Sequence, residues 1–177
     1  KRLPGFRKGG LVALKAHPAA AADDRVGTDR LELFAPAPEG GELIAGYKIG
    51  LTTPRMQKLC RGDRPISGVM PGRGIRRNGA KVKVSDFVHL GIESELAVRL
   101  SRPQPRGQAP VTRRDVADAA LQIAAAFELI EDRHADYSTL DWLWMAADNS
   151  WHVGLVLGPA VDPCDVADLA GVLAIDG

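Results

Sequence analysis

The chain has 177 residues, 45% of them hydrophobic, and its 23 basic and 22 acidic residues give a formal net charge of +1. This length suffices for one domain with a substantial core, and the near-zero net charge argues against a general attraction to nucleic acid. The mean hydropathy of −0.09 and the lack of any apolar run of membrane-spanning length predict a globular protein that does not cross a membrane.

The start of the chain and its cysteines bear on the cellular compartment. Residues 1–8 are basic and contain proline, but they lack the apolar core of a signal peptide. Cys60 and Cys164 have no metal-type spacing, and nothing else in the sequence indicates secretion. We therefore expect free thiols and a cytoplasmic protein.

The first 40 residues are expected to form a divergent or loosely ordered arm. They combine a basic start, a short alanine run and a Pro/Gly-rich loop at 36–41. Residues 43–52 then form an apolar stretch typical of a buried strand. Thr53 and Pro54 supply an N-cap and a first-turn proline for a helix that ends near Leu59.

The middle of the chain is predicted to consist of loops and short strands. Residues 61–79 are rich in glycine, proline and arginine and predict a long loop, and residues 80–84 alternate as a short strand. A longer strand is predicted over Gly91–Leu100, and residues 103–110 are expected to form another loop.

Two further helices are predicted from their caps. Thr112 with Asp115 resembles a capping box and predicts an alanine-rich helix to about residue 125. Ser138 with Asp141 predicts a second helix, which ends near residue 147.

Strands are predicted around these helices, at residues 127–131, 152–157 and, as a final stub, 172–175. Strands therefore dominate and are joined by a few separate helices without regular βαβ alternation. This arrangement is typical of an α+β fold.

The segment Gly91–Leu100 contains two glutamates separated by one residue. Its apolar side chains share one parity, so Glu93 and Glu95 lie on the opposite face of the strand, roughly 7 Å apart. Two adjacent carboxylates repel each other unless the face is solvated or a cation lies between them. A hard cation such as Mg²⁺ prefers such oxygen ligands, so a metal site and a solvated strand face are both open interpretations.

Four segments in a fixed order carry a resemblance to a known family. They are Gly46–Thr52 (GYKIGLT), Ile92–Glu95 (IESE), Ala126–Arg133 (AFELIEDR), and Ala147–Ser150 (ADNS) with Val156–Gly158 (VLG). Together they resemble the 2-keto-4-pentenoate hydratase and 4-oxalocrotonate decarboxylase branch of the fumarylacetoacetate hydrolase superfamily, over about residues 44–160. The resemblance implies a mixed, mostly β core of the fumarylacetoacetate hydrolase C-terminal-domain type, with a few flanking helices, over residues 41–177.

The resemblance also implies a metal site. The family's E-x-E pair falls on Glu93 and Glu95 and its third ligand on Glu128, which together would hold Mg²⁺ or Mn²⁺. Glu131 and Asp132 are alternative third ligands by proximity. Three carboxylates would leave positions on the cation for water and for the carboxylate and 2-oxo oxygens of a substrate.

Further site residues follow from the same resemblance. Lys48 is placed in the active site, to move protons or bind the substrate carboxylate, although an ion-paired lysine is the alternative. Arg133 would grip a carboxylate or form a structural ion pair with Asp136 or Asp148. Asp148 and Asn149 are expected to act as a cap and to support the residues of the site.

Two histidines near these motifs are weaker candidates. His89 precedes the E-x-E strand, and His134 follows the third glutamate strand. A lone histidine is more often exposed or hydrogen-bonded than catalytic, so neither is assigned a role.

The implied activity is that of a metal-dependent lyase. The resemblance indicates a hydratase for a small 2-hydroxydienoate or 2-oxo-enoate, such as 2-keto-4-pentenoate, in aromatic meta-cleavage catabolism. A 4-oxalocrotonate-type decarboxylase and an acylpyruvate hydrolase are the alternatives, and a non-catalytic homologue that supports an active paralogue is an alternative of another class.

The sequence departs from the family in three places, the first of which is the segment 1–40, where the family's N-terminal helix pattern is not found. Family hydratases usually carry an acidic residue in the loop that corresponds to 68–74, where this chain has Arg73 and no carboxylate. The chain also ends at Gly177, where relatives continue, so a domain shortened at its C-terminal end is expected. A homo-oligomer or a paralogous subunit would then cover the open sheet edge.

Overall fold

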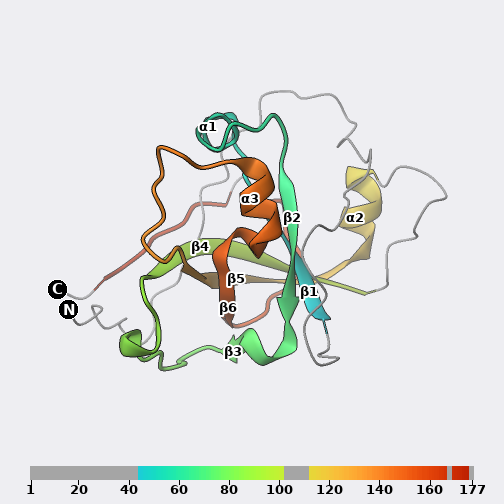
Figure 1. The fold of residues 1–177 in the computed structure, drawn as a ribbon. Coiled ribbons are helices and arrows are strands. Elements are labelled where there is room, and N and C mark those ends of the chain that lie inside the picture. The colour runs from blue at the N-terminus through green and yellow to red at the C-terminus, as the bar shows by residue number, and fades with distance from the viewer. Residues whose placement is uncertain (1–43, 102–111, 167–168, 176–177) are drawn as a thin grey trace. The chain divides into compact units, whose positions relative to one another are not determined.

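A computed structural model describes residues 44–101, 112–166 and 169–175 (Figure 1). The predicted arm at 1–40 and the predicted loop at 103–110 lie outside the described residues. Within them, the strands are β1 Ile44–Gly50, β2 Ile66–Pro71, β3 Ile75–Arg77, β4 Leu90–Leu100, β5 Ala120–Glu131 and β6 His152–Leu157. The α-helices there are α1 Pro54–Leu59, α2 Arg113–Ala119 and α3 Trp142–Ala147. The fold is thus α+β with a mostly β core, as predicted.

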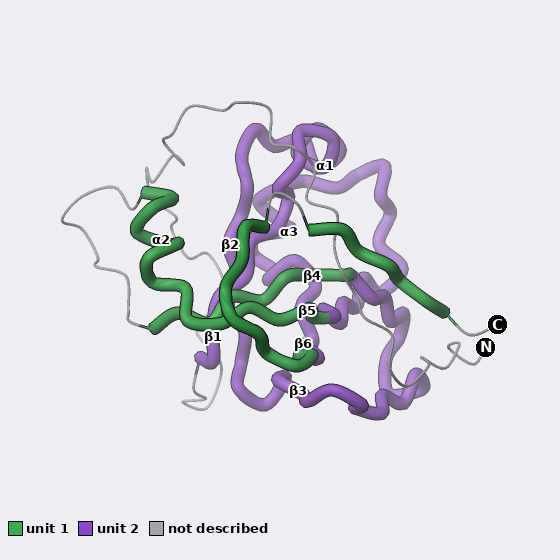
Figure 2. The backbone as a smooth tube through the Cα atoms, turned by 180° about the vertical axis from the view of Figure 1, so that it is seen from behind, with its two compact units in different colours: residues 1–30, 94–126, 157–177 green, residues 31–93, 127–156 purple. Residues whose placement is uncertain are grey.

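The chain divides into two compact units (Figure 2). Of the described residues, unit 1 comprises 94–101, 112–126, 157–166 and 169–175, and unit 2 comprises 44–93 and 127–156. The strands β4 and β5 each pass from one unit into the other.

Two sheets are formed. β1 and β2 pair in antiparallel fashion, with Tyr47 opposite Val69 and Lys48 opposite Gly68. The second sheet has four strands in the order β3-β6-β5-β4. β5 therefore has β6 on one side and β4 on the other, and this order brings the strands that carry the predicted glutamates next to each other.

The core of unit 2 forms around α3 and the residues on either side of α1. Its buried members are Leu51, Cys60, Ile66, Leu140, Met145, Ala146 and Trp151. α1 begins as predicted, because the Thr53 hydroxyl accepts a hydrogen bond from the Met56 N–H at 3.3 Å and Pro54 occupies the first turn. α3 is capped by Asp141, whose carboxylate accepts from the Leu143 N–H at 2.8 Å.

In unit 1, a capping box starts α2. The Thr112 hydroxyl accepts from the Asp115 N–H at 3.2 Å, and the Asp115 carboxylate accepts from the Thr112 N–H at 2.8 Å. Beyond the helix, Ile123 pairs with Val161 through two backbone hydrogen bonds of 2.8 and 2.9 Å.

Several predicted boundaries are wrong. The helix from Thr112 ends at Ala119, and residues 120–125 belong to β5, because strand neighbours and the Ile123–Val161 pairing outweigh the helix propensity of the alanines. The expected loop at 61–79 contains β2 and β3, which their sheet partners stabilise. The expected strands at 80–84 and 172–175 do not form, and Asp141 rather than Ser138 caps α3.

The prediction of a buried first strand is also wrong. In β1, the side chains of Tyr47 and Ile49 are 53% and 62% exposed, whereas the Lys48 side chain is only 8% exposed. The face of β1 that turns inward thus carries Gly46, Lys48 and Gly50. Gly68, which lies opposite Lys48 on β2, leaves room for the lysine, because a Cβ at this position would lie 3.0 Å from Lys48 Cγ.

None of the helices in the described ranges combines the length and the apolar character that a membrane crossing requires.

Candidate metal site

The three predicted metal-binding glutamates converge. Glu93 and Glu95 follow each other on β4, and Glu128 lies on the neighbouring strand β5. One carboxylate oxygen from each side chain lies within 4.8 Å of the other two. Glu93 is exposed, Glu95 is half-buried and Glu128 is buried at 4% exposure. This oxygen-only donor set fits a hard divalent cation, which would neutralise the three like charges.

The electrostatics of Glu93 support the same interpretation. Although the residue reaches solvent, the surrounding protein removes part of its hydration, and this desolvation raises its carboxyl pKa. The negative charge of Glu128 raises the pKa further, while Lys48 opposes the effect. Glu93 is therefore a carboxylate whose charge is costly until a cation approaches it.

Glu128 receives two hydrogen bonds on the same oxygen. The Lys48 ammonium forms an ion pair with Glu128 Oε1, and His152 Nδ1 lies 2.9 Å from that atom. The side chains of Lys48, Glu128 and His152 are 8%, 5% and 1% exposed. Burial raises the pKa of Glu128, but hydrogen bonding from His152 and the charge of Lys48 outweigh burial and lower it overall. Glu128 is thus held as a buried carboxylate.

Lys48 reaches this site because of its parity on β1. Its ammonium contacts the Ser150 carbonyl at 3.4 Å in addition to Glu128. Of the two interpretations of Lys48 from sequence, the ion pair is the arrangement that the structure shows.

Asn149 and Ser150 lie in a strained turn between α3 and β6. Asn149, Ser150 and Trp151 have consecutive positive φ angles of 51°, 49° and 61°, a conformation that costs residues other than glycine of order 1–3 kcal/mol each. The Asn149 side chain accepts from the Val69 N–H and donates to the Val69 carbonyl, both at 2.9 Å. Asn149 therefore fixes this turn to β2.

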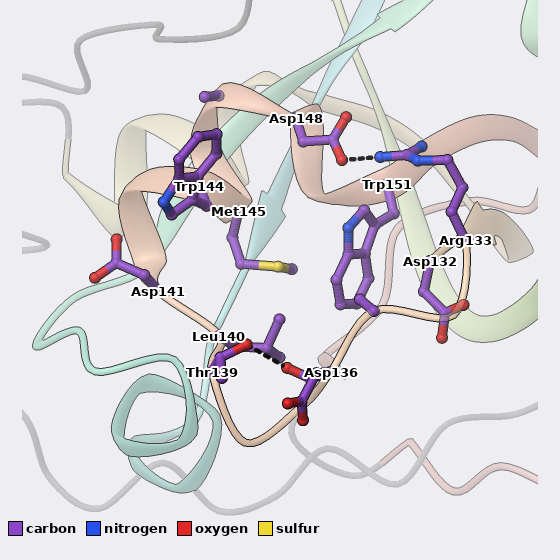
Figure 3. A pocket seen from close by; sticks show the side chains of 12 residues that line it. Asp132, Arg133, Asp136, Thr139, Leu140, Asp141, Trp144, Met145, Asp148 and Trp151 are labelled. Atoms are coloured by element: carbon purple, nitrogen blue, oxygen red, sulfur yellow. Dashed lines mark hydrogen bonds and ion pairs between the residues drawn. The ribbon is translucent and has the colours of Figure 1, made fainter.

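Arg133 forms an ion pair with Asp148 (Figure 3). The two side chains are 47% and 45% exposed, and Arg133 also donates to the Glu131 carbonyl at 3.3 Å. Asp148 is the C-cap residue of α3. The structural ion pair that was one alternative for Arg133 is therefore present.

The alternative third ligands have other partners. Glu131 Oε1 accepts from the Val88 N–H at 2.5 Å. Asp132 accepts from His89 Nδ1 at 2.5 Å, from the Tyr137 hydroxyl at 2.9 Å and from the His134 N–H at 3.0 Å. The structure thus brings Glu128, and neither of these residues, to the glutamate pair.

The surroundings of Asp132 shift two pKa values. Burial opposes its ionisation, but the hydrogen bonds from His89, Tyr137 and His134 prevail and lower its pKa. Burial and the Asp132 carboxylate raise the pKa of Tyr137 to about 12. The rings of His89 and His134 pack with their centroids 4.5 Å apart. Both histidines thus belong to a hydrogen-bonded cluster around Asp132.

A pocket of about 660 Å³ lies elsewhere in unit 2 (Figure 3). It is lined by Asp132, Arg133, Ala135, Asp136, Thr139, Leu140, Asp141, Trp144, Met145, Ala147, Asp148 and Trp151. The three glutamates of the cluster do not line it. Asp136 and Asp141 bind backbone N–H groups within their own turns, at Ser138 and Leu143, so these carboxylates already have partners.

His152 is the site residue that the sequence analysis missed. The sequence predicts it at the start of a strand and gives it no functional role. Its position two residues after the Ala147–Ser150 motif was the available signal. Its contact with Glu128, 24 residues earlier in the chain, depends on the pairing of β5 with β6.

No family model matches the sequence. Among curated relatives, a 2-keto-4-pentenoate hydratase of Burkholderia vietnamiensis is 29% identical over 140 residues, which cover 77% of this chain and 52% of that protein. A 2-oxo-hept-4-ene-1,7-dioate hydratase of Escherichia coli is 30% identical over 143 residues, which cover 76% of this chain and 52% of that protein. A 2-hydroxyhexa-2,4-dienoate hydratase of Comamonas testosteroni is 31% identical over 100 residues, which cover 55% of this chain and 37% of that protein. The chain spans about half the length of the first two relatives.

Solved structures of a 4-oxalocrotonate decarboxylase have a similar fold. The 4-oxalocrotonate decarboxylase from Pseudomonas putida G7, complexed with magnesium and adipate, matches with a TM-score of 0.62 and 24% identity over 69% of this chain and 46% of that one. The same enzyme complexed with calcium and acetate matches with a TM-score of 0.60. The curated relatives confirm the resemblance to the hydratases, and the solved structures confirm the fold that it implied.

Proposed function

We propose that the chain carries the metal centre of a divalent-metal-dependent lyase. The reaction would be hydration of a small 2-hydroxydienoate or 2-oxo-enoate, such as 2-keto-4-pentenoate, in aromatic meta-cleavage catabolism. The observation that carries this proposal is the approach of the Glu93, Glu95 and Glu128 carboxylates to within 4.8 Å of one another, with a buried lysine on Glu128. The hydratases among the curated relatives support the same class of reaction.

In this proposal, Glu93, Glu95 and Glu128 hold Mg²⁺ or Mn²⁺. When bound, the cation supplies Lewis-acid stabilisation of negative charge on the substrate's carboxylate and 2-oxo oxygens. Lys48 carries a proton at Nζ beside Glu128, in a position shielded from solvent. It is the residue that we assign to proton transfer as the dienol becomes an unsaturated ketone that water can attack.

Arg133 has a smaller part in the proposal. Its guanidinium is paired with Asp148, so binding a substrate carboxylate would require it to leave that partner. The supporting role predicted for Asp148 and Asn149 is more direct. Asp148 holds Arg133, and Asn149 fixes the turn whose Ser150 carbonyl contacts Lys48.

Decarboxylation of a 4-oxalocrotonate-type substrate is the second candidate. Residues 68–74 contain no carboxylate, whereas the hydratases that the sequence resembles usually carry an acid there. Hydration needs a group that activates water, but loss of CO₂ does not, so this feature favours decarboxylation. Hydrolysis of an acylpyruvate is the third candidate.

We also propose that the protein works in the cytoplasm as a homo-oligomer. A chain without turnover would instead support an active paralogue as a subunit of a mixed assembly. The mass of the purified protein in solution, measured by light scattering with and without a co-expressed paralogue, distinguishes these arrangements.

The deciding experiment follows the ultraviolet absorbance of 2-hydroxypenta-2,4-dienoate and, separately, 4-oxalocrotonate after addition of the purified protein, with Mg²⁺ and with EDTA. Mg²⁺-dependent loss of the first substrate supports the hydratase, and loss of the second supports the decarboxylase. Glu95→Ala should abolish turnover, whereas Asp86→Asn, which alters an exposed carboxylate near Lys83, should not. Undiminished turnover by Glu95→Ala would refute the metal assignment, and no turnover by a folded, metal-bound protein would favour the non-catalytic homologue.

A further inference from the structure

His152 has a deeply buried polar side chain next to the glutamate cluster. Only 1% of its side chain is exposed, and its Nδ1 lies 2.9 Å from Glu128 Oε1. Within the described part of the chain, its Nε2 has no hydrogen-bond partner. A buried imidazole with one satisfied nitrogen is costly, so its contact with Glu128 has to offset the desolvation of the ring.

The partner defines the direction of this hydrogen bond. An ionised carboxylate only accepts hydrogen bonds, so His152 Nδ1 carries the hydrogen. Lys48 donates to the same oxygen. Both hydrogen bonds described for Glu128 therefore end on Oε1, and neither uses Oε2.

The strained turn before β6 aims the imidazole at Glu128. Residues 149–151 have left-handed backbone conformations, and His152 returns to an extended conformation with φ −61° and ψ 124°. Asn149 holds this turn to Val69, and the Ser150 carbonyl contacts the Lys48 ammonium. One local structure thus positions both donors to Glu128 Oε1.

We infer that His152 is a positioning residue that, together with Lys48, immobilises Glu128 through Oε1 and leaves Oε2 as its single metal-binding oxygen. This inference rests on the proposed metal site. Two donors on one oxygen prevent rotation of the carboxylate and disfavour bidentate binding through both oxygens. Lys48 contributes charge, and His152 contributes a directional donor on a rigid ring.

A pair of matched substitutions tests this role. In His152→Asn, the side-chain amide nitrogen takes a place close to that of Nδ1, so the donor to Glu128 is kept. In His152→Gln, the amide extends toward the place of Nε2, and the donor to Glu128 is lost. The measurement is the Mn²⁺ dissociation constant, obtained from the electron paramagnetic resonance signal of free Mn²⁺, with thermal unfolding recorded for each variant.

We expect His152→Gln to weaken Mn²⁺ binding by about 10-fold or more, as is typical when a partner of a metal ligand is lost, and His152→Asn to retain wild-type affinity. Wild-type affinity in both variants, or an equal loss in both, would overturn the inference, because the Nδ1 donor would then not be the feature that matters. A wild-type protein that binds no Mn²⁺ would instead refute the proposed metal site itself.

A measurement on the wild-type protein keeps the inference testable if a variant does not fold. Long-range proton–nitrogen NMR spectra report which ring nitrogen of a histidine carries hydrogen. We expect a hydrogen on Nδ1 of His152. A ring with hydrogen only on Nε2 could not donate to Glu128 and would overturn the inference.

Discussion

The side chain of Asn149 forms two hydrogen bonds with the backbone of Val69: its Oδ1 accepts from the Val69 N–H, and its Nδ2 donates to the Val69 carbonyl, both at 2.9 Å. The Asn149 side chain thereby pairs with β2 as a neighbouring strand would, although Asn149 lies in a turn with left-handed backbone conformations. Asparagine tolerates this conformation better than most residues, which explains its suitability at this position.

We predict that Asn149→Ala destabilises the protein by about 2 kcal/mol, because the Val69 backbone groups lose their partner and alanine is strained at positive φ. Asn149→Gly separates the two causes, since glycine relieves the strain but restores neither hydrogen bond. Chemical denaturation of the three proteins measures the difference. Wild-type stability in Asn149→Ala would show that the hydrogen bonds contribute nothing.

Lys48→Met is predicted to lower both stability and turnover. Removal of one partner leaves the Glu128 carboxylate buried with a single donor, which typically costs about 3–5 kcal/mol. Loss of a residue that transfers a proton typically lowers kcat by about 100-fold or more. Lys58→Met, on the exposed surface of α1, is the control and should change neither quantity. Wild-type kcat in Lys48→Met would exclude a role for Lys48 in proton transfer.

Glu128→Gln and Glu131→Gln should differ sharply in metal binding. Glu128 belongs to the carboxylate cluster, so its amide variant should lose Mn²⁺ binding. Glu131 accepts a hydrogen bond from the Val88 N–H, so its variant should bind Mn²⁺ with wild-type affinity. Isothermal titration calorimetry gives both affinities. The reverse result would make Glu131 the third ligand.

The affinity for Mn²⁺ should fall as the pH is lowered toward the pKa of Glu93. That pKa is raised above 4.5 by desolvation and by Glu128, so the metal-free protein holds its proton at a higher pH than an ordinary glutamate does. Metal binding in this range must release the proton. Calorimetric titrations in two buffers with different ionisation enthalpies count the protons released, and no release at any pH below neutrality would contradict the assignment.

The raised pKa of Glu93 also affects the folding stability of the metal-free protein, which should fall, not rise, as the pH is raised. A raised pKa means that the folded state binds the proton more tightly than the unfolded state. The contribution of Glu93 to stability is therefore present below the ordinary pKa of 4.5 and is lost as the pH rises through the raised value. Added Mn²⁺ should reverse this trend, which thermal unfolding with and without the metal would show.

Features that depend on neighbouring residues alone were predictable from the sequence. The alternation of Gly91–Leu100 predicted the strand that carries Glu93 and Glu95, and Thr53 with Pro54 predicted the start of α1. The four motifs also indicated the family and, with it, the fold. Strand alternation and helix capping operate over a few residues, so sequence spacing is enough to reveal them.

Contacts between distant segments were decided by the tertiary structure. Sheet pairing at Ile123 turned the end of an alanine-rich helix into strand. Packing of β1 placed Lys48 on its inward face, beside Glu128, and left Tyr47 and Ile49 exposed. Side chains 80 and 24 residues away from Glu128 meet it at Oε1, and no local pattern encodes such distances. The sequence alone determined which carboxylates and which lysine were available, because motifs specify residue types. Only the tertiary structure decided that Lys48 and His152 share one oxygen of Glu128, because burial and strand pairing are properties of the whole chain.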